Sequence, residues 1–428
     1  MFFYFSAHKK NITYSRINRE VIFTYLLSVD ESVWFDHFFL SNVCPLFYVE
    51  TLSDLEKSVR SGRTPEQEVG LIAQKFPEMH GSPNVYHASL CIADLMGHPV
   101  PMTGQILLAG GRLVKVGCRT GVVYEELPEA EAFSRWQKHE FLEIERLYAS
   151  VWRKTITSLD LKELAKTFRA IGISGKSVKT LEEAKTIAES VVNSQDNIIE
   201  RMKLLLLFLN IPRILRRQIL QLWINAGYPP LVNYAPYAAY VLTVEVFFQV
   251  ALAADLISSE RPSNRVDIAY LFYLPFCMVF VSSDRLHRRC ALPFLRGNQE
   301  FVWGNDLKKD LERLNKHYAQ LPEIIKSRGV ISFASAPPKE GGFLVTSLWD
   351  RHLPRWRESR EKPPLKDPLR DSKIVEEIKK LTKAPPLQPE DVDFDPRNVD
   401  SLSIQRLVRK RKGTWWQLPK DLEVSEDN

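Results

Sequence analysis

Five acidic residues stand where apolar segments of the chain end or begin, and such positions can support metal-dependent chemistry. Asp30 ends the apolar run VIFTYLLSVD, and Glu50 and Asp54 follow the run PLFYV. Asp267 opens the segment VDIAYLFYL, and Asp284 follows the run CMVFVS. Because functional residues of an open parallel α/β sheet gather past the carboxyl ends of its strands, we expect these acids to converge there.

A cluster of three or four carboxylates indicates a divalent cation. Like charges held close together repel one another unless a cation lies among them, and carboxylate oxygens are ligands that Mg²⁺ and Mn²⁺ prefer. Such an ion activates water and neutralises the charge that develops when a phosphodiester is cleaved. The spacing leaves a second explanation open, because acids are common at helix starts, where they accept hydrogen bonds from free N–H groups.

Hydrophobic periodicity predicts the elements that must position these acids. We expect a buried strand at 21–30, an amphipathic helix over ESVWFDHFFLSN, a second strand at 45–49 and a helix in TLSDLEKSVR. Later in the chain, VDIAYLFYL predicts a helix, and CMVFVS and QEFVW predict strands. The strands that end at Asp30, Val49 and Ser282 should be neighbours in one mainly parallel sheet.

Most of the chain between these blocks is predicted to be helical. Three short apolar runs between about 101 and 126 indicate a small antiparallel β-meander. Amphipathic helices are expected at 131–154, 158–170, 180–193 and 196–209, and over ILRRQILQLWINA at 214–226. Beyond about 335 the composition changes, since 9 of the 26 prolines lie in the last 78 residues. This composition is typical of an extended arm that wraps the body of the protein.

Residues 237–257 are apolar and nearly long enough to span a membrane. They contain Glu245, Gln249 and Asp255, and a charge near a bilayer centre costs roughly 2.5 to 3.5 kcal/mol. We therefore predict a buried core helix, with Glu245 paired or turned toward the site, and no membrane association.

The composition is that of a soluble globular protein. The 428 residues suffice for roughly two to four domains, or for one core with large insertions. With 45% hydrophobic and 26% charged residues, wholesale disorder and a polytopic membrane protein are excluded. The five cysteines contain no CxxC pair, which indicates reduced thiols and a cytoplasmic location. A net charge of +6 permits a polyanionic partner.

Two blocks of sequence resemble the PIN-like nuclease domain. The first pairs LLSVDESVWF with PLFYVETLSDLEK, the second is RVDIAYLFYLPFCMVFVSSDRLHR, and together they cover residues 20–60 and 235–305. In that family four acids surround metal, and a Thr or Ser often stands two places before the last. The resemblance implies that Asp30, Asp54, Asp267 and Asp284 are the catalytic, metal-binding acids, and that Glu50 competes with Asp54 for the second position. It also implies that Ser282 supplies the hydroxyl beside the last acid and binds substrate.

The resemblance also implies a fold and its division along the chain. The fold would be α/β, a PIN-like three-layer core with a parallel sheet, plus a mostly helical insertion and an extended C-terminal arm. The expected segments are a discontinuous core of 15–60 and 210–305, a helical insertion with a small β-meander at 61–209, a C-terminal helix region at 306–334 and the proline-rich arm at 335–428.

The implied activity is metal-dependent hydrolysis of phosphodiester bonds, with RNA as the expected partner and one or two Mg²⁺ or Mn²⁺ ions as cofactor. Arg285, Arg288 and Arg289 follow the last acid and are expected to bind substrate phosphates. The basic, tryptophan-containing stretch RLVRKRKGTWW either binds single strands or docks on the body. The alternative function is a catalytically inactive PIN-like scaffold that acts as an interaction module. An inhibitory protein partner is one expected means of control, and the oligomeric state stays open.

Overall fold

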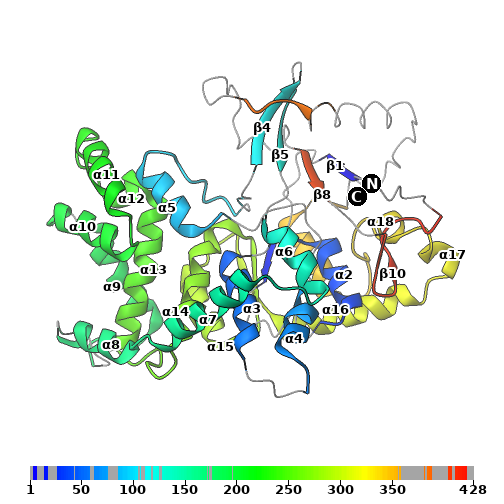
Figure 1. Ribbon diagram of the computed structural model, residues 1–428, viewed down its shortest axis with the longest axis horizontal. Helices are drawn as coiled ribbons and strands as arrows, with labels where there is room; N and C mark the ends of the chain where they lie inside the picture. The colour runs from blue at the N-terminus through cyan, green and yellow to red at the C-terminus, as the bar shows by residue number, and fades with distance from the viewer. Residues whose placement is uncertain are drawn as a thin grey trace.

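The computed structural model describes most of the chain between 27 and 357 and several shorter segments outside it (Figure 1). The described residues are 3–6, 14–17, 27–42, 44–57, 62–75, 85–104, 107, 111–116, 119–124, 128–170, 172, 176–194, 196–354, 356–357, 380, 383–387, 403–406 and 410–421.

A parallel sheet of four short strands organises the fold. The strands are β2 (Tyr14–Ile17), β3 (Leu40–Asn42), β6 (Val279–Ser282) and β7 (Glu300–Trp303). Their order is β3-β2-β6-β7, and every neighbouring pair is parallel. The central pair joins distant parts of the chain, because Ser15 lies opposite Val279. The strand order therefore reverses between β2 and β6.

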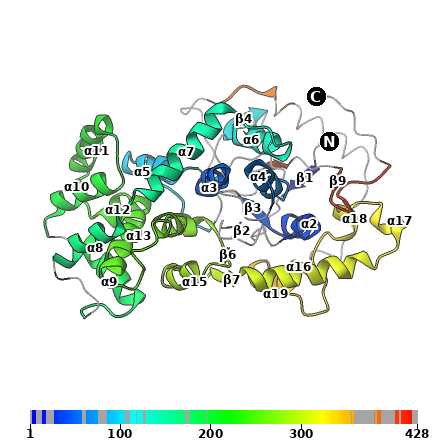
Figure 2. The same cartoon turned by 60° about the horizontal axis from the view of Figure 1, so that its bottom comes forward.

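Helices cover the sheet on both faces, as Figure 2 shows for the strands between α3 and α16. Val279 and Val281 of β6 pack in one hydrophobic cluster with α2, α16 and α19, whereas Phe280 packs in another with α3 and η2. Successive side chains of a strand point to opposite faces, so both faces of β6 are buried. These helices are α2 (Val29–Phe38), α3 (Pro45–Ser53), η2 (Tyr270–Phe276), α16 (Gly304–Ala319) and α19 (Leu344–His352). The expected combination of helices with a parallel sheet is confirmed.

Residues 45–49 form a helix, so the strand predicted there is wrong. They begin α3, with Pro45 at the first helical position after Cys44. Proline suits that position because its fixed φ is already helical and its missing N–H would have no partner there. A short apolar run fits a buried helix as well as a buried strand, and periodicity cannot separate the two. Glu50 therefore lies within α3, and Asp54 caps its end.

Asp30 lies in the first turn of a helix and does not end a strand. The backbone N–H of Glu31 donates to the Ser28 hydroxyl at 3.1 Å, and the N–H of Ser28 donates to the Glu31 carboxylate at 2.9 Å. This reciprocal capping fixes the start of α2. Residues 21–26 of the expected strand lie outside the described residues. The strand predicted to end at Ser282 is confirmed as β6.

The helices between the two halves of the sheet surround one central helix, α13 (Pro236–Ala253). The predictions at 158–170, 180–193, 196–209 and 214–226 are confirmed to within a few residues at each end. The corresponding helices are α8 (Leu161–Ala170), α9 (Leu181–Asn193), α10 (Ile198–Phe208) and α11 (Arg213–Asn225), and α12 (Leu231–Tyr234) leads into α13. Helix α13 is long and apolar enough to cross a membrane, but 89% of its residues are buried inside the protein.

Polar side chains fix both the start and the middle of α13. Asp94 of α5 (His87–Leu95) accepts hydrogen bonds from the backbone N–H groups of Tyr237 at 2.7 Å and Ala238 at 3.0 Å. Burial raises the pKa of the Asp94 carboxyl, and these hydrogen bonds oppose the shift. Glu245 forms a buried ion pair with Arg265 of α14 (Asn264–Ala269), as the sequence predicted.

The segment before these helices contains a β-hairpin and two separate helices. Strands β4 (Gly111–Val116) and β5 (Arg119–Tyr124) pair in antiparallel fashion. The meander was predicted from three apolar runs, and the first of them, at 105–108, lies largely outside the described residues. The single helix predicted at 131–154 is instead α6 (Pro128–Gln137) and α7 (Glu143–Thr157), because the chain turns at His139 with a φ of 62°. The remaining helices here are α4 (Pro65–Ala73) and η1 (Asp54–Glu56).

The C-terminal part of the chain returns to the body of the protein. Helix α19 packs in the core through Val345 and Leu348, so the body extends past the expected start of the arm at 335. Strand β8 (Ser403–Arg406) pairs with β1 (Phe3–Ser6), and a hairpin of two short strands docks beside α2 (Figure 1). The other elements are α15 (Arg285–Ala291), η3 (Leu292–Phe294), α17 (Glu323–Lys326), α18 (Val330–Phe333), β9 (Arg411–Lys412) and β10 (Trp415–Trp416).

Replacing Asp94 should destabilise the fold more than replacing an exposed helix cap does. Asp94→Ala leaves two buried N–H groups of α13 without their acceptor, which should lower the free energy of unfolding by about 1 to 3 kcal/mol. Asp160 is the matched control, since it accepts from Lys162 and Glu163 at an exposed helix start, where the loss should be about 1 kcal/mol or less. Urea denaturation measures both. Equal losses would show that Asp94 is an ordinary cap.

Candidate functional site

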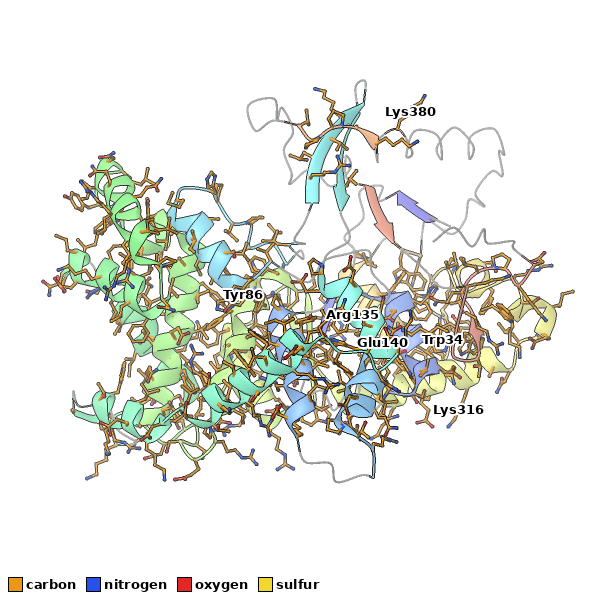
Figure 3. All side chains as sticks on the ribbon, in the orientation of Figure 1. Trp34, Tyr86, Arg135, Glu140, Lys316 and Lys380 are labelled. Atoms are coloured by element: carbon orange, nitrogen blue, oxygen red, sulfur yellow. The ribbon has the colours of Figure 1, made fainter. Side chains whose placement is uncertain are left out.

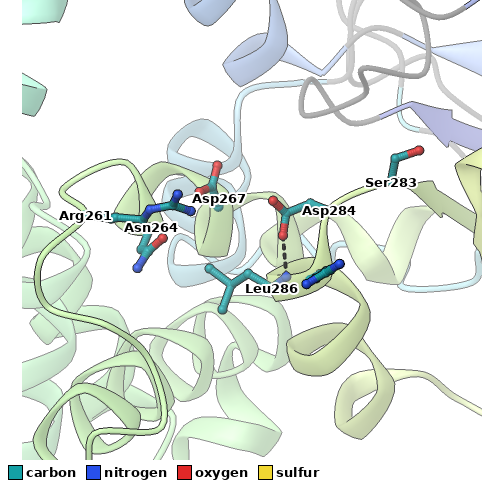
Figure 4. A pocket seen from close by; sticks show the side chains of 7 residues that line it. Arg261, Asn264, Asp267, Ser283, Asp284 and Leu286 are labelled. Carbon is teal, nitrogen blue, oxygen red and sulfur yellow. Dashed lines mark hydrogen bonds between the residues drawn. The ribbon is translucent and has the colours of Figure 1, made fainter.

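A pocket at the carboxyl end of β6 brings together Asp267 and Asp284 (Figure 4). Asp267 lies in α14, and Asp284 is the N-cap of α15, directly after Ser283. Ligands of open parallel sheets bind outside the carboxyl ends of the strands where the strand order reverses, and β6 lies at that point. The pocket has a volume of about 240 Å³ and is lined by Arg261, Asn264, Asp267, Ser283, Asp284, Arg285 and Leu286.

The carboxylate of Asp284 is held in place by the backbone. Its Oδ1 accepts hydrogen bonds from the N–H groups of Leu286 and, at 3.1 Å, His287. Figure 4 shows the other oxygen on the side of Asp267. The helix-cap explanation that the sequence left open is therefore correct for one oxygen of Asp284, and the residue also lines the pocket.

Two buried groups lie behind the acids of the pocket. The Ser282 hydroxyl is fully buried and accepts a hydrogen bond from the N–H of Asp284 at 3.0 Å. It also lies 3.0 Å from Nδ1 of His287, whose Nε2 is 2.9 Å from the carbonyl oxygen of Asp267. Burial lowers the pKa of His287, so the ring is neutral near pH 7. Ser282, predicted to bind substrate, is instead behind Asp284.

Glu50 is connected to this site through Tyr270, whose ring packs against His287. The buried carboxylate of Glu50 accepts a hydrogen bond from the Tyr270 hydroxyl at 2.5 Å. Its charge, like that of Asp284, raises the pKa of His287 and so opposes the larger effect of burial. Asp54 instead ends α3 and pairs with Lys57 at 2.7 Å. Between the two alternatives for the second acid, the geometry favours Glu50.

Asp30 is engaged elsewhere. Its two carboxylate oxygens accept hydrogen bonds from the backbone N–H of Thr414 at 2.8 Å and from the Thr414 hydroxyl at 2.6 Å. It does not line the pocket, and neither does Asp54. Among the described residues, no group of three or more His, Cys, Asp or Glu side chains is arranged to hold a metal ion. The pocket therefore combines two of the four acids that the resemblance implied.

The pocket contains one of the three arginines predicted to bind substrate. Arg285 lines it, whereas Arg288 lies over the Trp303 ring and Arg289 donates to the carbonyl of Leu256 at 3.1 Å. Sequence reasoning missed Arg261 and Asn264, which belong to the polar stretch SSERPSNR, whose last two residues begin α14. It also missed His287. The motif SSDRLH contains that residue, but nothing in the sequence indicated its partners.

Strands β9 and β10 (Arg411–Trp416) form the C-terminal hairpin, which docks on the body of the protein through one tryptophan and one lysine. The indole of Trp415 is 4% exposed and donates to Asn315 at 2.7 Å, and it packs against Trp34, which is labelled in Figure 3. Lys412 and Asp36 form a buried ion pair at 2.9 Å. The docking alternative is therefore correct for this part of the stretch RLVRKRKGTWW.

Comparisons of the chain with protein-family models, with curated proteins and with solved structures find no match. The functional interpretation therefore rests on the residues of the pocket and their surroundings.

Removing the Asp30 carboxylate should loosen the hairpin and leave the pocket intact. In Asp30→Ala, the backbone N–H and the hydroxyl of Thr414 both lose their acceptor on α2, so trypsin should cut after Lys412 at least several-fold faster than in the wild type. Asp54→Ala is the control, since Asp54 ends α3, pairs with Lys57 three residues later in the chain, and is not the acceptor for Thr414. Mass spectrometry of timed digests measures the cut. Loss of Mn²⁺ binding with an intact hairpin would return Asp30 to the metal site.

Proposed function

We propose that this protein is a metal-dependent nuclease that hydrolyses phosphodiester bonds of RNA in the pocket beside β6. One observation carries the proposal. Asp267 and Asp284 arrive from different elements and line the same pocket, with Arg261 and Arg285 among its other lining residues. Paired carboxylates with adjacent guanidinium groups suit a site where a cation and a phosphate are bound together.

The donor atoms of the pocket fit Mg²⁺ or Mn²⁺. Carboxylates, the amide oxygen of Asn264 and the hydroxyl of Ser283 are hard oxygen donors, which these ions prefer. Mg²⁺ commonly binds through only one or two carboxylates, and keeps water and substrate phosphate as its other ligands. When bound, the ion lowers the pKa of a coordinated water and neutralises charge on the phosphodiester. Asp267 and Asp284 would hold it.

The other residues of the pocket bind and orient the substrate in this proposal. The guanidinium groups of Arg261 and Arg285 present several N–H donors in a plane, which matches the oxygens of a phosphate. The two backbone hydrogen bonds to Asp284 keep one of its oxygens fixed before the substrate arrives. Such pre-organisation reduces the reorganisation that the reaction requires.

A second cluster favours a nucleic acid over a small phosphoester. Three cations surround the ring of Trp416, with Lys410 at 5.9 Å, Arg411 at 5.1 Å and Lys420 at 5.9 Å from its centroid. The buried pair of Lys412 and Asp36 holds this part of the hairpin on the body. Positive charge next to an aromatic ring suits the backbone and bases of a single strand.

We include in the proposal that the sheet and its covering helices form a PIN-like core. The four parallel strands, the helices on both faces and the pocket at the reversal of strand order support this reading. One observation favours the alternative, a catalytically inactive scaffold of the same fold. Asp30 and Asp54 are used in contacts outside the pocket, and a cap can explain the presence of Asp284.

Asp284→Asn separates the enzyme from the scaffold. The variant loses a unit of negative charge and a hard donor, so Mn²⁺-dependent cleavage of a panel of single-stranded RNAs should be abolished. Asparagine caps helices as well as aspartate does, so the melting temperature without metal should stay the same or rise. Asp284→Ala is the matched variant, because it loses both functions and should also melt lower. Absence of metal-dependent cleavage of RNA or DNA by the wild type, with a lower melting temperature for Asp284→Asn, would establish the scaffold.

The two arginines of the pocket should affect substrate and not metal. Arg261→Gln and Arg285→Gln each remove a charge-assisted contact to phosphate, which should weaken RNA binding by about tenfold or more. Each should also reduce the slope of log affinity against log salt by about 1. Arg288→Gln is the control, because Arg288 packs over Trp303 outside the pocket. Fluorescence anisotropy with labelled RNA at several salt concentrations measures both effects. Equal losses for all three variants would place the RNA elsewhere.

A further inference from the structure

His287 is a fully buried titratable side chain beside the residues that line the pocket. It is 0% exposed, and the rings of Tyr270 and Phe280 pack edge-on against it at 5.8 and 5.9 Å between centroids. A buried imidazole is stable only when its polar nitrogens find partners. Both nitrogens of His287 have one, and each partner belongs to a segment that carries an acid of the pocket.

The hydrogen-bond directions at His287 follow from its partners. A carbonyl oxygen can only accept, so Nε2 carries the proton and donates to the Asp267 carbonyl. Nδ1 of the neutral ring then accepts from the Ser282 hydroxyl, whose oxygen accepts from the N–H of Asp284. A continuous chain of hydrogen bonds therefore runs from the backbone of Asp284 through Ser282 and the imidazole to the backbone of Asp267.

We propose that His287 is a positioning residue that sets the separation of the Asp267 and Asp284 carboxylates. Its ring joins α14 to the end of β6, and its backbone N–H also donates to the Asp284 carboxylate at 3.1 Å. His287 therefore forms hydrogen bonds to both Asp267 and Asp284. The inference deepens the proposed function and rests on it, because the separation matters chemically only if the two acids share an ion.

An apolar side chain of similar size cannot replace this arrangement. It would fill the space between Tyr270 and Phe280 but leave the Asp267 carbonyl and the Ser282 hydroxyl without their partner. Glutamine is the conservative replacement, because its amide N–H₂ can take the place of Nε2–H. Hydrogen-bonding partners behind metal ligands typically change metal affinity by about 10- to 100-fold when they are removed.

The test measures Mn²⁺ binding by calorimetry in the full-length protein, together with melting without metal. His287→Leu should weaken Mn²⁺ binding by about 10- to 100-fold, and His287→Gln should recover part of that loss. Ser282→Ala removes only the middle of the chain of hydrogen bonds, so it should shift affinity in the same direction by less. It also serves as the test if His287→Leu does not fold.

His352→Leu is the matched control, since His352 is also buried and bonded, to Glu300 at 2.7 Å, but lies outside the pocket. It should melt lower without a change in Mn²⁺ affinity. If the wild type binds Mn²⁺, Asp284→Asn does not, and both the His287 and Ser282 variants bind like the wild type, His287 is purely structural and the inference is wrong while the proposed function stands. If the wild type does not bind Mn²⁺, the proposed function fails and the inference fails with it.

Discussion

The apolar character of α13 constrains the rest of the structure. A helix that is apolar on every side must be covered on every side, and α5, α8, α9 and α10 pack around it. Its first N–H groups are capped by Asp94 from α5, and Glu245 in its middle pairs with Arg265 of α14. Both polar contacts link α13 to neighbouring elements, so the helix fixes the position of the segment that leads into β6.

The pocket depends on that segment. Helix α14 and η2 run from the end of α13 toward β6, which places Asp267 beside the strand that Asp284 follows. The parallel pairing of β6 with β2 then creates the reversal of strand order at which the pocket lies. His287 closes the arrangement, because it bonds to the Asp267 carbonyl and the Ser282 hydroxyl.

Aspartate side chains have different structural roles in this protein, and the residues around each aspartate determine its role. Asp30 and Asp36 of α2 hold the C-terminal hairpin through Thr414 and Lys412. Asp94 caps a buried helix. Asp267 and Asp284 differ from these acids because they line a pocket whose cationic residues are Arg261 and Arg285.

The sequence by itself determined the amphipathic helices between 158 and 226, the strands at 279–282 and 300–303, and the burial of the segment around Glu245. Hydrophobic periodicity and the cost of a charge in a bilayer are local properties of a segment. The sequence also predicted that Asp267 and Asp284 lie close together, and both line the pocket. Tertiary structure decided that 45–49 is helical, since a short apolar run satisfies either state until its neighbours are present. It also decided which acids meet. That choice depends on pairings between distant residues, such as Ser15 with Val279, which no local pattern encodes.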